Sequence, residues 1–304
     1  MTFNQLRTFV EVAASGSVIE AARTLLVSPP AVSAAVGSIE KELGIQLVER
    51  AGRGLVITPA GMVFARYANQ VLALLETGKA ATAEALDPER GQLRLVAVTT
   101  AGEHVVPRFL ASFRTRHPEA GITLEVGNRA RVWDALEQHE ADLAVGGRPP
   151  GGGRFVTLAT RPNVLVLVAA GTGKPSVRQV DVETLARSVV LIREEGSGTR
   201  GTAEELLDEL GVDPRTLTLG SNGAIRESVQ VGLGITLISR DAVARELDEG
   251  AMEEWRCASL PRQRAWHVVA RAHEHLPATA GLFLTHMVDG GGDGFTLVRG
   301  ASPG

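Results

Sequence analysis

Cysteine is nearly absent from this chain of 304 residues, because Cys257 is the only one. A lone cysteine cannot form a disulfide within the chain, which excludes disulfide-stapled secreted scaffolds and fits a reducing compartment. No pattern of catalytic partners surrounds Cys257, so we expect a buried structural residue rather than a nucleophile.

Long apolar runs are also missing. No stretch approaches the roughly 20 residues that a membrane-spanning helix requires. The N-terminus lacks the basic segment followed by an apolar one that marks a signal peptide. We therefore expect a cytoplasmic protein that makes no membrane contact. The apolar content of 44% is ordinary for a globular protein, and the length suits two or three domains.

The usual marks of an enzyme are missing too. There is no P-loop, no GxGxxG fingerprint and no GxSxG nucleophile elbow. The seven histidines show no spacing with cysteine or carboxylates that suits a metal. The hydroxyl in Gly196-Ser197-Gly198 has no matched base. We predict no catalytic site, no metal site and no cofactor.

The chain also lacks a strong positive charge. The net charge of the chain is −4, and residues 1–66 carry six basic and five acidic side chains. A basic footprint is the usual mark of a nucleic-acid binder. Any contact with DNA must therefore rest on a few well-placed side chains, because composition alone does not indicate it.

The stretch from Ser17 to Thr58 predicts two short helices followed by a hairpin. Apolar spacing predicts a helix over 18–27 and a second over 28–43, which Ser28 caps and Gly44 ends. The outer face of the second helix is nearly bare of long charged side chains. Such a face is either a neutral surface or one that enters the major groove of DNA.

The hairpin favours the second interpretation. Residues 47–48 and 56–57 read as strands, and the turn between them carries glycines together with Arg50 and Arg53. A basic hairpin beside a reading helix is typical of a wing, which meets phosphates or the minor groove.

Residues 3–61 resemble the N-terminal domain of LysR-type transcriptional regulators. The residues that carry the resemblance are Leu6-Arg7-Thr8-Phe9, Gly16-Ser17, Ala21-Ala22, Ser28, Pro30-Ala31-Val32-Ser33, Ile39-Glu40, Leu43-Gly44, Leu47, Arg50 and Thr58-Pro59-Ala60-Gly61. Two positions depart from the family. Pro29 replaces a glutamine that commonly faces DNA, and Val48 replaces a phenylalanine.

The resemblance and the helix pattern together imply a set of DNA contacts. We expect the exposed face of the second helix, its start and the wing to meet double-stranded DNA. The expected residues are Ser17, Ser28, Pro29, Pro30, Ser33, Ala34, Gly37, Arg50 and Arg53.

A long helix follows the wing. Helix 2–14 supports the reading pair, and Thr58-Pro59 begins a helix that extends to about residue 86. Its apolar stripe is close to heptad spacing, which favours pairing with a second copy over packing on its own chain. The residues of this expected dimer contact are Phe64, Tyr67, Val71, Leu74 and Leu75.

From Gln92 onward, apolar strands alternate with amphipathic helices, which indicates an α/β architecture. We expect strands at 93–98, 122–126, 142–145, 155–158, 164–169, 189–193, 216–219 and 235–239, and helices at 103–116, 132–139, 199–210 and 224–231. This region resembles the family's two-lobed effector domain, which is similar to periplasmic solute-binding proteins.

The predicted fold is thus an N-terminal all-α winged helix-turn-helix with a long linker helix, followed by a two-lobed α/β effector domain. The expected domains are 1–58 for DNA binding, 59–90 for the linker and hinge, and 91–304 for the effector, with lobe one at about 91–162 and 268–304 and lobe two at about 163–267.

Polar residues gather where these strands end and helices begin, which is where α/β folds bind ligands. The candidate effector residues are Thr99, Thr100, Asn128, Gly147, Arg148, Arg193, Ser197, Thr199, Ser221 and Asn222. Two alternatives stay open. The hydroxyls either contact a ligand or only cap helices, and Arg193 either faces the ligand or points away. The resemblance places Thr99 and Thr100 at the family's usual effector position.

Segment 193–234 resembles the branch of the family that includes regulators of carbon fixation and sulfur assimilation. This resemblance implies a small anionic effector, a homodimer or homotetramer, and RNA polymerase as a further partner. Two other classes remain alternatives: a solute-binding receptor without a DNA role, and an enzyme that uses the cleft. The missing signal peptide, the wing arginines and the missing nucleophile–base pair count against them.

Overall fold

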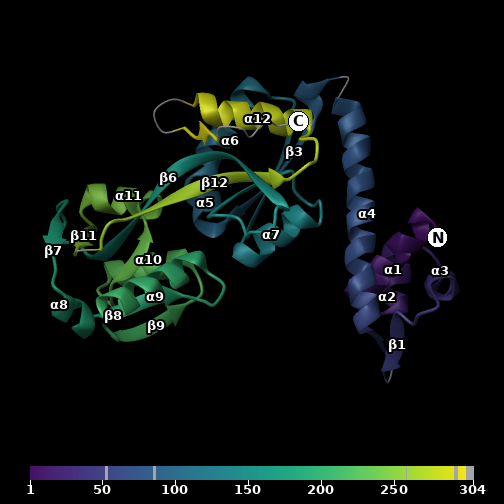
Figure 1. Ribbon diagram of the computed structural model, residues 1–304, viewed down its shortest axis with the longest axis horizontal. Coiled ribbons are helices and arrows are strands. Elements are labelled where there is room, and N and C mark those ends of the chain that lie inside the picture. The colour runs from purple at the N-terminus through teal and green to yellow at the C-terminus, as the bar shows by residue number, and fades with distance from the viewer. Residues whose placement is uncertain (52–53, 85–86, 258, 291–293, 299–304) are drawn as a thin grey trace. The chain divides into compact units, whose positions relative to one another are not determined.

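The computed structural model describes residues 1–51, 54–84, 87–257, 259–290 and 294–298. The chain forms two compact units (Figure 1). The first consists of residues 1–83 with 137–140, and the second of residues 84–136 with 141–304. Arg53 and the expected end of the linker helix at Leu86 lie outside the described residues.

Three helices and a hairpin begin the first unit. They are α1 (Phe3–Ser15), α2 (Val18–Leu25), α3 (Pro29–Leu43), β1 (Val48–Ala51) and β2 (Gly54–Ile57). One apolar face of each helix meets in a common core, because apolar residues recur at helical spacing. This core contains Phe9, Val12, Ala21, Ala22, Val32, Val36, Ile39 and Leu47.

The start of α3 corrects one expectation. Ser28 occupies the N-cap position, but its hydroxyl accepts no capping hydrogen bond. Pro29 and Pro30 fill the first two helical positions and have no N–H to offer. The N–H of Ala31 donates instead to the carbonyl oxygen of Ser28, at 3.0 Å. Ser28 therefore lies at the helix start with its hydroxyl unused by the cap.

The hairpin is longer than the expected pairs of residues. β1 and β2 are antiparallel, with Val48 opposite Ile57 and Arg50 opposite Leu55. The apolar pattern stops earlier than the strands, because the hydrogen-bonded ladder continues toward the turn after the side chains become polar. Thr58 then caps the long helix α4 (Pro59–Glu84), since its hydroxyl accepts from the N–H of Gly61 at 2.9 Å.

Helix α4 presents two different apolar faces. Phe64 packs against Phe9 in the core of its own unit, with ring centroids 5.3 Å apart. Tyr67, Val71 and Leu74 are exposed, and Val63, one turn earlier, extends the same stripe toward the helix start. Of the expected dimer residues, Phe64 thus belongs to the core of its own chain, and Leu75 is half-buried.

The second unit is built on a large mixed sheet. Its strands follow the order β4-β3-β5-β12-β6-β11-β7, and β10 and β13 also pair with β6. They are β3 (Gln92–Val98), β4 (Gly121–Gly127), β5 (Leu143–Gly146), β6 (Phe155–Ala170), β7 (Val177–Gln179), β10 (Thr236–Ser239), β11 (Met252–Arg256), β12 (Arg262–Arg271) and β13 (Thr296–Leu297). A small parallel sheet pairs β8 (Val189–Arg193) with β9 (Arg215–Leu219).

Helices cover these sheets and divide them into two lobes. Lobe one carries the short 3-10 helix η1 (Pro88–Arg90) and α5 (Thr99–His104), α6 (Val106–Arg116), α7 (Arg129–Glu137) and α12 (Ala278–Asp289). Lobe two carries α8 (Val182–Arg187), α9 (Gly198–Leu210), α10 (Asn222–Gln230) and α11 (Arg240–Glu249). Each lobe has its own apolar core.

Two long antiparallel strands, β6 and β12, cross from one lobe to the other (Figure 1). The expected ranges 155–158 and 164–169 are both strand, but the gap predicted between them is wrong, because the structure has one continuous strand, Phe155–Ala170. Its middle, Arg161-Pro162-Asn163, interrupts the apolar pattern where the strand leaves one core and enters the next. The ladder with β12 continues through this break.

The helix expected over 103–116 is also divided. α5 ends at His104 and α6 begins at Val106, with Pro107 in its first turn. Proline interrupts a continuous helix because it lacks an N–H and its ring clashes with the preceding turn. The first of the two helices, α5, is short and begins with Thr99 and Thr100 directly after β3.

None of the helices in the described part of the chain is both long enough and apolar enough to span a membrane.

Candidate functional site

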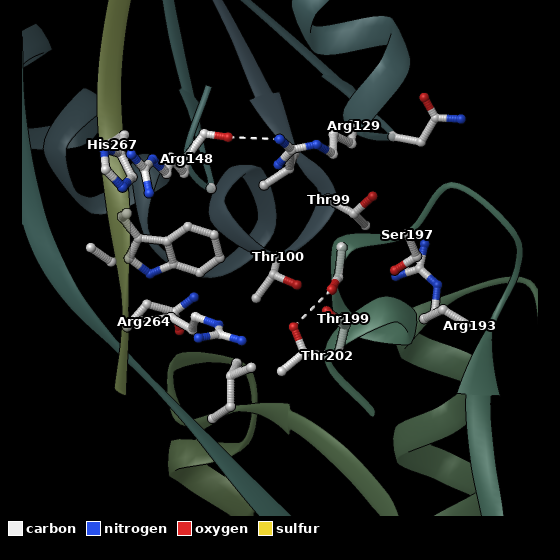
Figure 2. A pocket seen from close by; sticks show the side chains of 18 of the residues that line it. Thr99, Thr100, Arg129, Arg148, Arg193, Ser197, Thr199, Thr202, Arg264 and His267 are labelled. Atoms are coloured by element: carbon white, nitrogen blue, oxygen red, sulfur yellow. Dashed lines mark hydrogen bonds between the residues drawn. The ribbon is translucent and has the colours of Figure 1, made fainter. Parts of the chain in front are cut away.

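A pocket of about 390 Å³ lies between the two lobes of the second unit (Figure 2). The ends of β3, β4 and β5 form its wall in lobe one, and the start of α9 forms its wall in lobe two. The crossing strands β6 and β12 contribute the rest. It is lined by Val98, Thr99, Thr100, Gly127, Asn128, Arg129, Gly147, Arg148, Asn163, Leu165, Arg193, Glu194, Ser197, Gly198, Thr199, Thr202, Glu205, Arg264, Ala265, Trp266 and His267.

The wall in lobe one is held by short polar contacts. Thr99 and Thr100 begin α5 directly after β3, and Thr99 Oγ1 donates to the carbonyl oxygen of Gly127 at 3.4 Å. Arg129 donates to the carbonyl oxygen of Arg148 at 2.7 Å, which ties the start of α7 to the segment after β5. These contacts fix hydroxyl and guanidinium groups around one side of the cavity.

The wall in lobe two is the first turn of α9. Ser197 is its N-cap residue, but its hydroxyl makes no capping hydrogen bond. The first N–H groups of a helix have no partner within it and favour an anion. The capping alternative is thus resolved differently at two sites: Ser197 does not cap, whereas Ser221 caps α10 by accepting from the N–H of Ala224 at 3.1 Å.

The charges that line the pocket are mostly positive. Arg193 is paired with Glu194 at 2.7 Å, and Arg264 is paired with Glu205 at 2.9 Å. Hydrogen bonds from Arg193 hold the pKa of the Glu194 carboxyl below its ordinary value. Arg129 and Arg148 complete the set. Within the described ranges, no carboxylate lies within ion-pair distance of Arg148. The pocket therefore offers positive charge that its own glutamates do not neutralise.

His267, on β12, lies on the same side of the pocket as Arg148 (Figure 2). Burial lowers the pKa of its imidazole below the ordinary value, and the positive charge of Arg148 lowers it further. Both effects favour the neutral form of the His267 imidazole. A neutral imidazole can donate or accept one hydrogen bond at each ring nitrogen, depending on its tautomer.

The structure brings most of the expected effector residues into this one pocket. Thr99, Thr100, Asn128, Gly147, Arg148, Arg193, Ser197 and Thr199 all line it. Ser221 and Asn222 do not line it, because Ser221 caps α10 and Asn222 is buried behind the pocket wall. Of the two alternatives for Arg193, the structure places it at the pocket.

Several lining residues on the crossing strands and on helices α7 and α9 were not predicted from the sequence. These are Arg129, Asn163, Thr202, Glu205, Arg264, Trp266 and His267. Most lie in strands or helices rather than after strand ends, so the search for polar turns could not find them. Arg129 was the exception, since it directly follows Asn128 in the same turn.

The expected DNA-contacting residues of α3 share one exposed face. Ser28, Pro29, Pro30, Ser33, Ala34 and Gly37 are all exposed, whereas Ser17 is half-buried and caps α2 by accepting from the N–H of Glu20. Arg50 belongs to β1, and Arg53 lies outside the described residues. The bare face predicted from the sequence is thus continuous over more than two turns.

A helical reading unit with a hairpin, joined to a two-lobed α/β unit with a polar pocket, defines a DNA-binding regulator with an effector domain. Two sequence-family models match the chain. One, for the LysR substrate binding domain, matches residues 86–291, and the other, for bacterial regulatory helix-turn-helix proteins of the lysR family, matches residues 3–62. The chain belongs to the LysR family of DNA-binding, effector-binding transcriptional regulators, and it is not an enzyme.

Relatives of this chain include regulators of the carbon-fixation branch. The chain is 33% identical to the transcriptional regulator CbbR of Xanthobacter flavus over 91% of this chain and 84% of that protein. It is 31% identical to a RuBisCO operon transcriptional regulator of Acidithiobacillus ferrooxidans over 96% and 95%. The resemblance to regulators of carbon fixation is therefore confirmed.

A solved structure shares the fold of the second unit. The regulatory domain of CcmR from Synechocystis PCC6803, in complex with 2-PG, is 28% identical with a TM-score of 0.58. It covers 64% of this chain and 94% of that chain. The expected fold class, an N-terminal helix-turn-helix followed by a two-lobed effector domain, is confirmed by the two family models together with this structure.

Proposed function

We propose that a small anionic metabolite binds in the pocket between the lobes and thereby changes how the regulator engages DNA. The observation that carries the proposal is Arg148, a pocket guanidinium without a carboxylate partner in the described part of the chain. Ser197, Gly198 and Thr199 at the start of α9 line the same cavity, and a helix start favours negative charge. The ligand must bind one lobe arrangement more tightly than another in order to act.

The regulator acts as a homodimer or a homotetramer in this proposal. The exposed stripe of α4, with Tyr67, Val71 and Leu74 at its centre, supports a helix pair between two copies. Pairing would place two copies of α3 on the two halves of an operator dyad. RNA polymerase and a cytoplasmic location belong to the same proposal, because a transcriptional regulator acts where its promoter is. We also propose 1–58, 59–90 and 91–304 as the functional domains.

Replacing Arg148 with alanine is expected to weaken anion binding about tenfold or more, because a charge-assisted hydrogen bond contributes roughly 1.5–3 kcal/mol. A thermal-shift screen with 2-PG, sugar phosphates, dicarboxylates, inorganic phosphate and sulfate identifies the anion. Calorimetric titration then compares the variant with the wild type.

The matched control is Arg245→Ala, because Arg245 lies on the exposed surface of α11 and pairs with Glu249 of the same helix. This control should bind as the wild type does. Equal loss in both variants, or none in Arg148→Ala, would show that the positive charge of the pocket does not select the ligand.

The affinity for sulfate is expected to rise as the pH falls from about 8 to about 6, the range in which histidine titrates. The pKa of His267 is lowered in the free protein by burial and by Arg148. A bound anion favours the protonated imidazole, so binding takes up a proton. Affinity therefore increases as the pH falls through the pKa of the complex, and levels off below the pKa of the free protein.

Sulfate is the suitable probe because its own charge does not change over this range. Calorimetric titration at four pH values measures the slope, and His267→Gln should abolish it. A slope that persists in the glutamine variant would assign the proton to another group.

A further inference from the structure

Three buried polar side chains form a hydrogen-bonded chain that crosses the boundary between the lobes. Arg193 Nη1 donates to Asn222 Oδ1, and Asn222 Nδ2 donates to Thr100 Oγ1 at 2.9 Å. Asn222 and Arg193 belong to lobe two, whereas Thr100 belongs to lobe one. The exposed fractions are 2% for Asn222, 7% for Arg193 and 7% for Thr100, so all three side chains are buried. Only Thr100 and Arg193 line the pocket.

The direction of each hydrogen bond in this chain is fixed by chemistry. An arginine side chain can only donate, so the oxygen of the Asn222 amide must face Arg193. The amide nitrogen must then face Thr100, which removes the usual ambiguity between the two ends of an asparagine. That nitrogen can only donate, so the Thr100 oxygen accepts.

An accepting hydroxyl keeps its own proton for another partner. Thr100 Oγ1 has no hydrogen-bond acceptor for this proton among the residues that the structure describes, and its side chain lies near the centre of the pocket view (Figure 2). A bound anion supplies such an acceptor.

We propose that Asn222 is a positioning residue that makes Thr100 a hydrogen-bond donor toward the ligand. Asn222 does not touch the ligand itself. It occupies the acceptor side of the Thr100 hydroxyl, which leaves only the donor side for the pocket. This inference rests on the proposed function, because it requires an acidic ligand in this pocket. It also means that the hydrogen bond between Asn222 and Thr100 links a ligand contact of lobe one to lobe two.

The Asn222→Asp variant reverses the polarity of the chain. Its carboxylate still accepts from Arg193, but it has no proton to give to Thr100. The Thr100 hydroxyl must then donate to the carboxylate and loses its proton for the ligand. We expect the affinity for 2-PG and for inorganic phosphate to fall about tenfold or more, as in Thr100→Val, because a hydrogen bond to a charged group has about this effect.

The new negative charge of Asn222→Asp could lower anion affinity by repulsion alone, so the test is a double-mutant cycle measured by calorimetric titration. If Asn222 acts through the Thr100 proton, adding Asn222→Asp to Thr100→Val has no further effect. Equal, additive losses in the two backgrounds would overturn the proposal, because repulsion does not depend on the threonine.

Asn222→Leu provides the second variant. It removes both hydrogen bonds of the amide, yet the Thr100 proton stays available to the ligand. We expect its affinity to remain within about threefold of the wild type, which is small beside the loss of a charged hydrogen bond. A structural role for Asn222 predicts the opposite order, with the leucine variant losing at least as much affinity as Asn222→Asp, and that order would overturn the proposal.

Failure of the proposed function looks different from failure of this inference. If the wild-type protein binds neither 2-PG, nor inorganic phosphate, nor any anion of the screen, the pocket is not an anion site and both proposals fall. If the wild type and Asn222→Asp bind the same probe equally, only the role of Asn222 is wrong.

Discussion

Replacing Leu74 with glutamate is expected to convert the regulator to monomers at micromolar concentration. Leu74, Val71 and Tyr67 form an exposed apolar stripe on α4, and a paired helix would remove this stripe from water. A carboxylate at the centre of that contact would be buried without a partner, which costs several kcal/mol. Sedimentation velocity at several concentrations measures the change in mass.

The same variant is expected to bind a dyad-containing operator about a hundredfold more weakly, because two linked reading units gain by effective concentration. Asn69→Glu is the matched control, since Asn69 is exposed on α4 but lies away from the stripe by helical geometry. The control should stay dimeric and bind DNA normally. A dimeric Leu74→Glu protein would exclude this stripe as the contact between copies.

Replacing Ser33 with glutamate is expected to reduce operator binding by about a hundredfold or more, since phosphate repulsion adds to lost base-edge contacts of roughly 1–3 kcal/mol each. Ser33 lies in the middle of the exposed face of α3, between Pro30 and Gly37. A small side chain there lets the backbone approach the base edges, and a carboxylate does not. Fluorescence anisotropy with a labelled operator fragment measures the loss.

Ser38→Glu is the matched control for that experiment. Ser38 lies on the same helix but on the side of α1, where its hydroxyl accepts from Gln5. Circular dichroism should show both variants folded, because both positions are exposed. If Ser33→Glu binds the operator as tightly as Ser38→Glu does, this face of α3 does not read DNA.

The first unit was predictable from its sequence because local signals agree with the packing. Apolar spacing predicted the helices. Gly44 lies at the end of α3, and Thr58-Pro59 lies at the start of α4, as expected. For the pair Pro29-Pro30, the position at the helix start was predicted correctly, but the effect on the Ser28 cap was not. Both prolines fit the helix start, but their missing N–H groups also leave the Ser28 hydroxyl without a capping role. Pro29 therefore changes the exposed surface of α3 and not its fold.

The second unit was predictable only where a strand stays within one core. β6 was split into two expected strands, because Pro162 and its polar neighbours lie at the crossing between lobes. Beyond Ser239 no helix or strand was predicted, although the structure has α11, β11, β12 and α12 there. Strands β11 and β12 pair with the distant strand β6, and that pairing has no signal in a local window.

The pocket was predicted from one rule, that ligands bind where strands end and helices begin. The rule found Thr100, Arg148 and Ser197 but not His267, because β12 crosses beneath the pocket instead of ending there. It also placed Asn222 at the ligand, whereas the structure places this residue behind Thr100. Burial and hydrogen-bond direction, which a sequence does not carry, separate these two roles.

The central claim is that an anion in the pocket changes how the reading units engage DNA. A DNase I footprint on the regulator's own upstream DNA tests it most directly, with and without the anion that stabilises the protein in the thermal-shift screen. We expect the anion to alter the footprint or the DNA affinity of the wild type and to have no effect on Arg148→Ala, which should still bind DNA. An anion that saturates the wild-type protein while footprint and affinity stay the same would contradict the claim.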